Sequence, residues 1–261
     1  MSGAPATVLV VRPRAQADAW VDALVALGVP ARALPLIEIM PAPDAASVAA
    51  AFSEVESSRD EPMLVFVSPN AVHGFFGAVV PARAWPARAW AAATGPGTVA
   101  ALRECGVPAE RIAAPPSEAP QFDSEALWAV VRSWPWMRRP VWIVRGNGGR
   151  DWLGEQLREA GADVRVVQSY GRAAPVLSDD ERALLAAALA EPVRWIWMFS
   201  SSEAIAHLQA LVPAARWNAS RALASHPRIA DSARALGFGS VAVVAPTARA
   251  VAEAVLPKPG A

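Results

Sequence analysis

An internal repeat is the feature of this sequence that most constrains its fold. Three segments recur in the same order, and the matched pairs are 8–29 with 141–164, 63–76 with 195–208, and 90–107 with 221–238. The displacements are nearly constant at 133, 132 and 131 residues, measured from Arg12 to Arg145, from Ser68 to Ser200 and from Pro96 to Pro227. Chance matches between short apolar runs would scatter these displacements. The chain is therefore predicted to contain a duplication.

Each repeat is predicted to consist of alternating strands and helices. The short apolar runs VLVV, LVFV, WIV and WIWMF are typical of strands that are buried on both faces of a parallel sheet. Small polar residues, Gly or Pro follow each run, and apolar residues at helical spacing come next. This pattern predicts two α/β domains with helices on both faces of each sheet. The Pro-containing segments 41–43 and 172–175 are the predicted connections between them.

Composition argues against several classes of protein. The chain has 261 residues with 24 basic and 24 acidic side chains, so no nucleic-acid partner is expected. Long uncharged apolar runs are missing, so no membrane association is expected. One cysteine and three histidines predict neither a disulfide framework nor a metal site. The first residues do not resemble an export signal, which predicts a cytoplasmic protein, and the balanced charge is compatible with a monomer.

Polar residues follow the predicted strands at the sheet edge where α/β proteins bind ligands. The N-terminus of the helix that follows each loop offers free N–H groups and roughly half a positive charge, which suit carboxylates or phosphates. These loops supply the candidate binding residues Ser68, Asn70, Thr94, Gly95, Gly97, Thr98, Gly146, Ser200, Ser201, Ser202, Ser225, His226 and Arg228. The alternative is that their Ser, Thr, Asn and His side chains only cap helices.

Two arginines and the single tyrosine are further candidates. Arg12 and Arg145 end equivalent predicted strands, and each could bind a carboxylate or form a structural ion pair with Asp or Glu. Tyr170 follows the strand-like sequence VRVVQS, and its neutral phenol could donate a proton or anchor a domain junction. His73 and His207 are interpreted as structural residues at equivalent positions of the two repeats.

Several motifs together resemble the uroporphyrinogen-III synthase family. They are VLVVRP, PLIEI (35–39), FVSPNAV (66–72), ATGPGTVAAL (93–102), FDSEALW (122–128), segment 141–164, VQSYGR (167–172) and FSSSEAI (199–205). No single string is diagnostic, but their order and spacing over nearly the whole chain are specific. One departure lies in ASHPRIADSARALGF (224–238), where Arg228 and Ile229 stand at positions that are commonly threonine in the family.

The resemblance implies two flavodoxin-like domains with parallel sheets, joined by a two-stranded hinge, with one domain inserted in the other. Domain 1 would comprise 1–38 and 172–261, and domain 2 would comprise 41–168. The implied reaction converts hydroxymethylbilane, a linear tetrapyrrole with several carboxylates, to uroporphyrinogen III. Water is lost and the last pyrrole ring is inverted, without a cofactor. Tyr170 matches the family's tyrosine, which is proposed to assist departure of the hydroxyl group.

Two other functions are compatible with the same pattern. The main alternative is a non-catalytic two-domain module that binds small anions, since duplicated α/β domains with a hinge also serve that purpose. A flavin or nucleotide enzyme on this fold is the other. The segment RGNGGR (145–150) lacks the lysine of a P-loop and the order G-x-G-x-x-G, which argues against a nucleotide site there.

Overall fold

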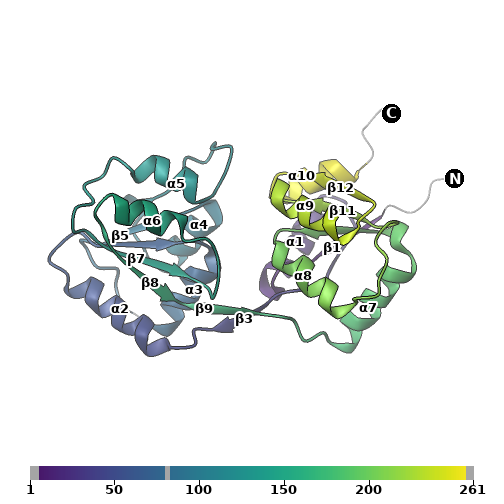
Figure 1. Ribbon diagram of the computed structural model, residues 1–261, viewed down its shortest axis with the longest axis horizontal. Coiled ribbons are helices and arrows are strands. Elements are labelled where there is room, and N and C mark those ends of the chain that lie inside the picture. The colour runs from purple at the N-terminus through teal and green to yellow at the C-terminus, as the bar shows by residue number, and fades with distance from the viewer. Residues whose placement is uncertain (1–5, 80–82, 257–261) are drawn as a thin grey trace. The chain divides into compact units, whose positions relative to one another are not determined.

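The computed structural model describes residues 6–79 and 83–256, and the chain forms two compact units. Unit 1 comprises residues 1–38 and 173–261, and unit 2 comprises residues 39–172. The predicted α/β class is confirmed, because each unit has a parallel five-stranded sheet with helices packed against it (Figure 1). The domain boundaries expected from the sequence, 1–38 with 172–261 and 41–168, remain a prediction. The outermost residues of the expected domain 1, 1–5 and 257–261, lie outside the described residues.

The sheet of unit 1 has the spatial order β12-β11-β10-β1-β2. Its strands are β1 (Thr7–Val10), β2 (Ala31–Ala33), β10 (Trp195–Phe199), β11 (Arg221–Ala224) and β12 (Ser240–Val243). All four neighbouring pairs are parallel. Numbered by chain position within the unit, the order is 2-1-3-4-5, the flavodoxin-like arrangement.

The helices of unit 1 pack against the two faces of this sheet. They are α1 (Arg14–Ala26), α7 (Asp179–Ala190), α8 (Ser202–Leu211), α9 (Pro227–Leu236) and α10 (Ala248–Val255), with a 3₁₀ turn at Pro192–Arg194. Val8 and Val10 pack with Leu24 of α1 and Val251 of α10 in one apolar cluster. Trp197 of β10, whose neighbours in the strand face that cluster, instead contacts aromatic rings on the opposite face. The period-two alternation thus builds two apolar layers from one strand.

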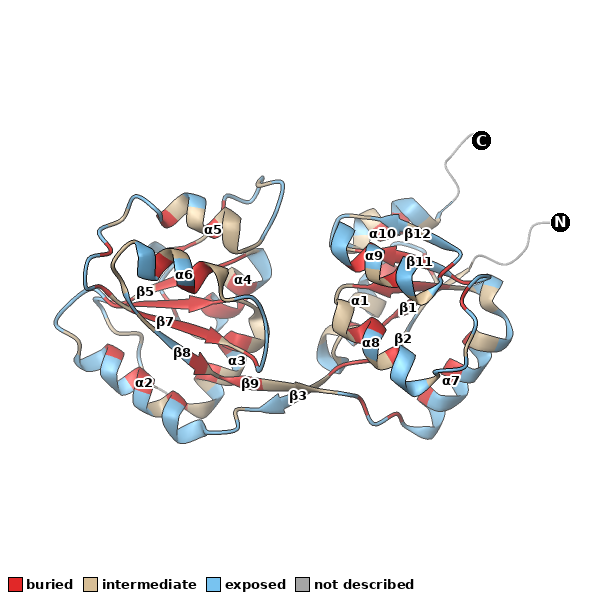
Figure 2. Cartoon of the chain, in the orientation of Figure 1, coloured by how far each residue is buried: buried red, intermediate tan, exposed pale blue. Residues whose placement is uncertain are grey.

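The sheet of unit 2 has the spatial order β6-β5-β4-β7-β8, again with every neighbouring pair parallel. The strands are β4 (Met63–Phe66), β5 (Trp90–Ala93), β6 (Ile112–Ala113), β7 (Pro140–Arg145) and β8 (Asp163–Gln168). The helices are α2 (Ala45–Ser57), α3 (Pro69–Ala78), α4 (Pro96–Glu104), α5 (Ser124–Val131) and α6 (Trp152–Glu159), with a 3₁₀ turn at Ala109–Arg111. Figure 2 shows buried strands between helices whose outer faces are exposed.

Alternate side chains of β4 serve two different apolar clusters. Leu64 and Phe66 pack with α2, α3 and α4, whereas Met63 and Val65 pack with α5 and α6. All four residues are buried, which explains why the strand appears in the sequence as a continuous apolar run. Helices therefore cover both faces of this sheet, as the sequence predicted.

Strand pairing corrects the alignment of the repeats by one residue. Val8 pairs with Ile196 in unit 1, and its equivalent Val141 pairs with Met63 in unit 2. Met63 therefore corresponds to Ile196, a displacement of 133 rather than the predicted 132. Ser68 consequently corresponds to Ser201 and not to Ser200. The sequence comparison was wrong here because three consecutive serines follow β10, and a one-residue slip still aligned serine with serine.

The two sheets have the same spatial arrangement of equivalent strands, but the chain enters them at different points. In unit 2 the order by chain position is 3-2-1-4-5, because the chain begins at the central strand β4. In unit 1 it begins instead at β1, the equivalent of β7. The duplication is thus visible in the topology as well as in the sequence, with the connections permuted.

A separate two-stranded sheet marks the passages of the chain between the units. Its strands are β3 (Glu38–Pro41) and β9 (Tyr170–Ala173), which pair with each other. The chain leaves unit 1 through β3 and returns through β9. Pro41 ends its strand and so interrupts no central ladder. The two-stranded connection predicted for the fold is present.

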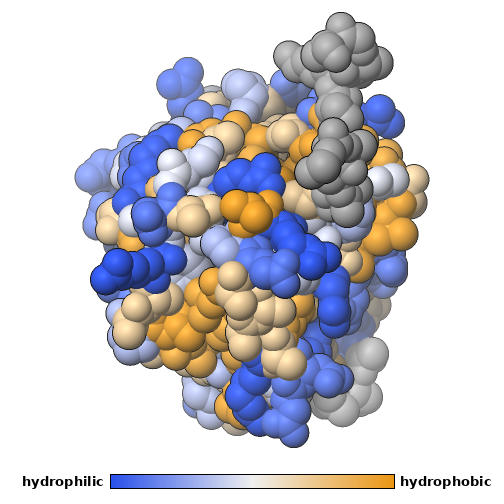
Figure 3. Space-filling view, turned by 90° about the vertical axis from the view of Figure 1, so that its right-hand side faces the viewer, coloured by the Kyte–Doolittle hydropathy of each residue, from blue (hydrophilic) through white to orange (hydrophobic). Residues whose placement is uncertain are grey.

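Among the residues described, no helix is long and apolar enough to span a membrane. Figure 3 shows hydrophilic and hydrophobic residues interspersed over one face of the molecule.

Candidate active site

In unit 2, the predicted site residues follow four neighbouring strands. β5, β4, β7 and β8 lie side by side in the sheet and run parallel, so their carboxyl ends lie along one edge. Thr94 follows β5, Ser68 follows β4, Arg145 ends β7, and Tyr170 comes two residues after β8. The topology therefore gathers these residues at one edge, which we call the unit 2 rim.

Tyr170 is fixed at this rim through its hydroxyl group. Its side chain is buried, with 5% of the residue exposed, and its Oη lies 3.3 Å from Ser68 Oγ. Ser68 is the N-cap of α3, and its Oγ also accepts a hydrogen bond from the Ala71 N–H at 3.2 Å. The phenol oxygen is thereby linked to the N-terminus of a helix, where the backbone dipole is positive.

The backbone around Tyr170 is held against α3. The Ser169 hydroxyl donates to the Ala71 carbonyl at 2.9 Å, and Ser169 is fully buried. Gly74 of α3 approaches so closely that an added Cβ would lie 2.2 Å from the Ser169 carbonyl oxygen. Only glycine allows this approach without movement of the backbone. The position of Tyr170 thus depends on contacts to residues about 100 positions away.

Gly146 and Asn147, which directly follow β7, complete the support of Tyr170. A Cβ added to Gly146 would lie 2.7 Å from Tyr170 Cζ, so the phenol ring lies directly on the Gly146 backbone. Asn147 pairs with the backbone of β9: its Nδ2 donates to the Arg172 carbonyl at 3.0 Å, and its Oδ1 accepts from the Arg172 N–H at 2.8 Å. Asn147 was not among the residues predicted from the sequence.

The loop after β5 presents backbone rather than hydroxyl groups. Thr94 and Thr98 are buried, and the Thr94 hydroxyl donates to the Val67 carbonyl at 3.2 Å. Gly95 is the N-cap of α4 and supplies no side-chain cap, and Gly97 is exposed in the first turn of that helix. The donors available to an anion here are therefore the N–H groups at the start of α4.

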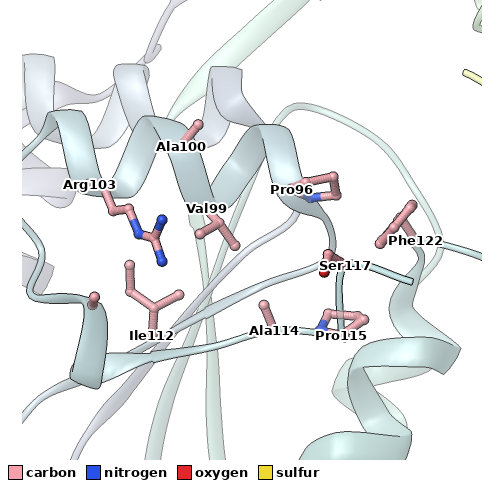
Figure 4. A pocket seen from close by; sticks show the side chains of 10 residues that line it. Pro96, Val99, Ala100, Arg103, Ile112, Ala114, Pro115, Ser117 and Phe122 are labelled. Carbon is pink, nitrogen blue, oxygen red and sulfur yellow. The ribbon is translucent and has the colours of Figure 1, made fainter. Parts of the chain in front are cut away.

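A cavity of about 460 Å³ adjoins this loop (Figure 4). Pro96, Val99 and Ile112 supply apolar walls, and Arg103 is the cationic side chain in its lining. Phe122, at one end, also packs on Gly95, where an added Cβ would lie 2.9 Å from Phe122 Cβ. The lining is chemically suited to an uncharged ring that carries an acidic substituent.

Arg145 forms the structural ion pair that the sequence left open as an alternative to substrate binding. Its Nη1 lies 3.5 Å from Asp151 Oδ1, and both side chains are partly exposed. Asp151 also binds Arg158, at the shorter distance of 2.8 Å. Arg145 is thus already near a carboxylate, although a long pair of this kind would leave part of its guanidinium available.

Arg12, the counterpart of Arg145 in unit 1, has different partners. Its Nε donates to Ser200 Oγ at 3.1 Å, and its guanidinium lies 4.8 Å from the ring centroid of Trp20. Burial lowers the pKa of the Arg12 guanidinium from its ordinary value. Within residues 6–79 and 83–256, no carboxylate oxygen lies within ion-pair distance of Arg12. A partly buried cation without a carboxylate partner is chemically suited to an anionic ligand.

The other predicted residues of unit 1 follow β10 and β11 and mostly serve as caps. Ser201 caps α8 by accepting from the Glu203 N–H at 3.1 Å, and the Ser202 hydroxyl accepts from Ser232 at 3.0 Å. His226 caps α9 by accepting from the Arg228 N–H at 3.1 Å. The capping alternative for His226 is therefore present in the structure. Together with Arg12, these residues form the unit 1 rim.

The interpretation of His73 and His207 as equivalent residues is wrong. With the corrected displacement of 133, His207 corresponds to Gly74. His207 Nδ1 lies 2.7 Å from the Leu36 carbonyl oxygen, and Leu36 corresponds to Ser169, the residue whose carbonyl Gly74 approaches. Both helices thus contact the same backbone position, one through an imidazole and the other through a bare Cα. The structural role predicted for His207 is confirmed by this contact.

Asn70 lies in the first turn of α3, and Ser225 follows β11 with its N–H bonded to the Phe199 carbonyl at 3.0 Å. For the described residues, no group of three or more His, Cys, Asp or Glu side chains is arranged to hold a metal ion.

The residues that sequence reasoning missed are Gly74, Phe122, Asn147 and Ser169. Phe122, Asn147 and Ser169 lie within the motifs quoted above, but their roles depend on contacts between distant segments, which the motifs do not specify.

Comparison with solved structures shows the fold. A mutant uroporphyrinogen III synthase from the extremely thermophilic bacterium Thermus thermophilus matches with a TM-score of 0.55 and 18% identity, covering 90% of this chain and 92% of that one. A uroporphyrinogen-III synthetase from Helicobacter pylori matches with a TM-score of 0.58 and 17% identity, covering 95% and 97%. At these identities the similarity establishes shared architecture.

The family itself is established by the sequence model for "Uroporphyrinogen-III synthase HemD", which matches residues 18–252. The matched region includes both rims except for Arg12, and it covers most of the two units. The resemblance first drawn from scattered motifs is confirmed. This chain belongs to the uroporphyrinogen-III synthase family.

Proposed function

We propose that this chain catalyses the cyclisation of hydroxymethylbilane to uroporphyrinogen III, with loss of water and inversion of the last pyrrole ring. Membership of the synthase family supports this assignment and does not favour the non-catalytic anion-binding alternative. The observation that carries it is the Tyr170–Ser68 contact at the unit 2 rim, which fixes a proton-bearing phenol at a helix N-terminus. A module that only bound anions would have no need of a fixed phenol at this place.

In the proposed reaction, Tyr170 donates its proton to the departing hydroxyl group. The C–O bond of the hydroxymethyl carbon breaks, the pyrrole nitrogen supplies the electron pair that replaces it, and the oxygen leaves as water. A positioned acid of this kind typically contributes roughly 10²–10⁴-fold to a rate. No cofactor is invoked, because the substrate's own pyrrole nitrogen drives the departure.

The remaining task of the protein is to hold a flexible polyanion in a reactive conformation. We assign binding of its carboxylates to Arg12, Arg145, Asn70 at the start of α3, the serines that begin α8, and backbone N–H groups near Gly95, Gly97, Gly146, Ser225, His226 and Arg228. Holding reacting atoms in a near-attack geometry can lower a barrier by up to roughly 7–11 kcal/mol. This contribution determines which ring carbon attacks, and hence which isomer forms.

The protein is further proposed to act as a cytoplasmic monomer with a small-molecule substrate and no nucleic-acid partner. The formal net charge of zero supports the absence of a nucleic-acid partner, because no basic excess is available to neutralise phosphates. Sedimentation at micromolar concentration should give a mass near 27.4 kDa. A dimer mass that persists on dilution would contradict the proposal.

The function is tested by following bilane conversion. The purified chain is mixed with freshly generated hydroxymethylbilane, and the products are oxidised to porphyrins and separated by chromatography. Excess of the inverted isomer over a protein-free control supports the proposal. Formation of the uninverted isomer alone, at the protein-free rate, would reject it.

A further inference from the structure

The hydroxyl group of Ser68 has one hydrogen bond that its capping role does not use. As N-cap of α3, Ser68 Oγ accepts from the Ala71 N–H at 3.2 Å. Its own proton is not needed for that contact, and the Tyr170 oxygen lies 3.3 Å away. A hydroxyl group can accept one hydrogen bond and donate another at the same time. Ser68 is therefore able to donate to Tyr170 while it caps the helix.

The direction of this hydrogen bond decides what the phenol can do. If Tyr170 donated to Ser68, its proton would be occupied within the protein. If Ser68 donates, the phenol proton is available for a substrate oxygen, and the same serine proton remains directed at the oxygen once the phenol proton has left. A hydrogen bond to an anionic oxygen is roughly twice as strong as one between neutral groups.

We propose that Ser68 is a positioning residue for Tyr170 that donates a hydrogen bond to the phenol oxygen and stabilises the phenolate formed during catalysis. The inference rests on the proposed function and assigns Ser68 a role other than direct substrate binding. When the substrate's C–O bond breaks, the Tyr170 proton leaves with the oxygen as water. The phenolate then accepts the hydrogen bond from Ser68 and lies near the positive end of α3.

The proton balance closes within one turnover. After the substituted carbon of the last pyrrole has attacked, it bears both the new bond and its original bond to the bridging methylene. The original bond then breaks, the methylene bonds to the unsubstituted carbon of the same ring, and that carbon loses its proton to restore the aromatic ring. That proton returns to the phenolate and regenerates Tyr170. Ser68 keeps its own proton throughout, so it acts through Tyr170 and exchanges nothing with the substrate.

Three substitutions at Ser68 separate the donor role from the capping role. Ser68→Ala removes both, Ser68→Asp keeps a good N-cap but cannot donate from an ionised carboxylate, and Ser68→Thr keeps both. Thr247→Ala is the matched control, because Thr247 caps α10 in unit 1 by accepting from the Ala250 N–H at 3.2 Å. It therefore removes a hydroxyl cap elsewhere in the chain.

We expect Ser68→Ala and Ser68→Asp to lower kcat about tenfold or more with little change in KM, since a charge-assisted hydrogen bond is lost. Ser68→Thr should restore most of kcat, and Thr247→Ala should leave it unchanged. The double variant Ser68→Ala/Tyr170→Phe should be no slower than Tyr170→Phe alone. Wild-type kcat in Ser68→Asp, or multiplicative losses in the double variant, would overturn the inference.

A spectroscopic readout distinguishes failure of this inference from failure of the proposed function. Tyr170 is the only tyrosine, so labelling tyrosine rings with ¹³C gives one set of NMR signals. Ser68→Ala and Ser68→Asp should shift these signals, whereas Thr247→Ala should not. Unshifted signals in both Ser68 variants would overturn the positioning role whatever the activity. Inactivity of the wild-type protein toward bilane would instead reject the proposed function.

Discussion

The ring of Tyr170 lies on the backbone of Gly146, with only 2.7 Å between Tyr170 Cζ and the place where a Cβ of residue 146 would be. Gly146 does not have a positive φ, so alanine is acceptable to its backbone. Gly146→Ala should therefore disturb the phenol by steric contact alone. We expect kcat to fall about tenfold or more, because the Tyr170 oxygen would move away from Ser68 and from the substrate.

The control for this substitution is Gly77→Ala, since nothing lies within 4 Å of a Cβ added to Gly77 of α3. Steady-state kinetics of both variants, with the thermal midpoint measured alongside, separate misplacement from unfolding. Normal kcat in folded Gly146→Ala would show that the position of the phenol ring is not important for turnover.

Tyr170→Phe removes the proposed acid while preserving the ring contact with Gly146. We expect kcat to decrease by no more than roughly 10²–10⁴-fold, because a general acid supplies only part of the acceleration. The product should still be the inverted isomer, since binding determines the ring-closure geometry. Single-turnover assays with separation of the isomers measure both quantities. Unchanged kcat would remove Tyr170 from the mechanism.

The two equivalent arginines should contribute unequally to substrate binding. Arg12 lacks a carboxylate partner among the described residues, whereas Arg145 lies 3.5 Å from Asp151. Hydrogen bonds to charged groups are worth about 1.5–3 kcal/mol, so Arg12→Gln should raise KM about tenfold or more. Arg145→Gln should raise it less.

A surface arginine of unit 1 gives the control for loss of positive charge. Arg234 pairs with Asp231 on α9 and is exposed, so Arg234→Gln should leave KM at the wild-type value. KM should be measured at two salt concentrations for all three variants. A larger effect at Arg145 than at Arg12 would contradict the assignment of Arg12 as the principal carboxylate-binding arginine.

Glu181 should make the stability of unit 1 dependent on pH. The hydrogen bond from Arg14 at 2.7 Å, together with bonds from Ser178, lowers the pKa of Glu181 below its usual 4.5. A carboxylate with a lowered pKa stabilises the fold above its unfolded-state pKa, and this stabilisation is lost as pH falls through the folded-state value. Acid should therefore weaken this contact below about pH 4.5.

Glu181→Gln should lower the free energy of unfolding by about 1 kcal/mol at neutral pH, with a smaller difference in acid, because the ion pair with Arg14 is lost while glutamine still completes the capping box. Asp180→Asn is the control, since Asp180 is an exposed residue in the same first turn of α7. Urea unfolding between pH 3 and pH 7 measures the difference. An equal effect of Glu181→Gln at every pH would contradict the electrostatic account.

The fold could be predicted from the sequence because its signals are local and repeated. Apolar runs of three to five residues specify buried strands, and their recurrence at nearly constant displacement specifies two similar units. The register of the repeat was harder to predict from the sequence, since Ser200, Ser201 and Ser202 cannot be distinguished in a sequence comparison. Only the pairing of β1 with β10 and the cap on α8 identify Ser201 as the counterpart of Ser68.

The support of Tyr170 could not be predicted, because its members are far apart in the chain. Gly74 lies in none of the family motifs, and the motifs that contain Asn147 and Ser169 do not indicate their contacts. Each of the three residues acts through a backbone contact that exists only once the sheet has formed. The candidate binding residues at the strand ends could be predicted from the sequence, since parallel strands bring their carboxyl ends to one edge of the sheet. Only the structure shows which of their polar atoms form hydrogen bonds within the protein, as the Thr94 hydroxyl does with the Val67 carbonyl.

The isomer ratio of the cyclised product tests the central claim most directly. Hydroxymethylbilane is incubated with the wild-type chain under conditions where spontaneous closure is slow, and the oxidised porphyrins are quantified by chromatography. We predict that the inverted isomer predominates and that its share rises with protein concentration. A product mixture that contains only the uninverted isomer at every protein concentration would contradict the assignment of this chain as a cyclising synthase.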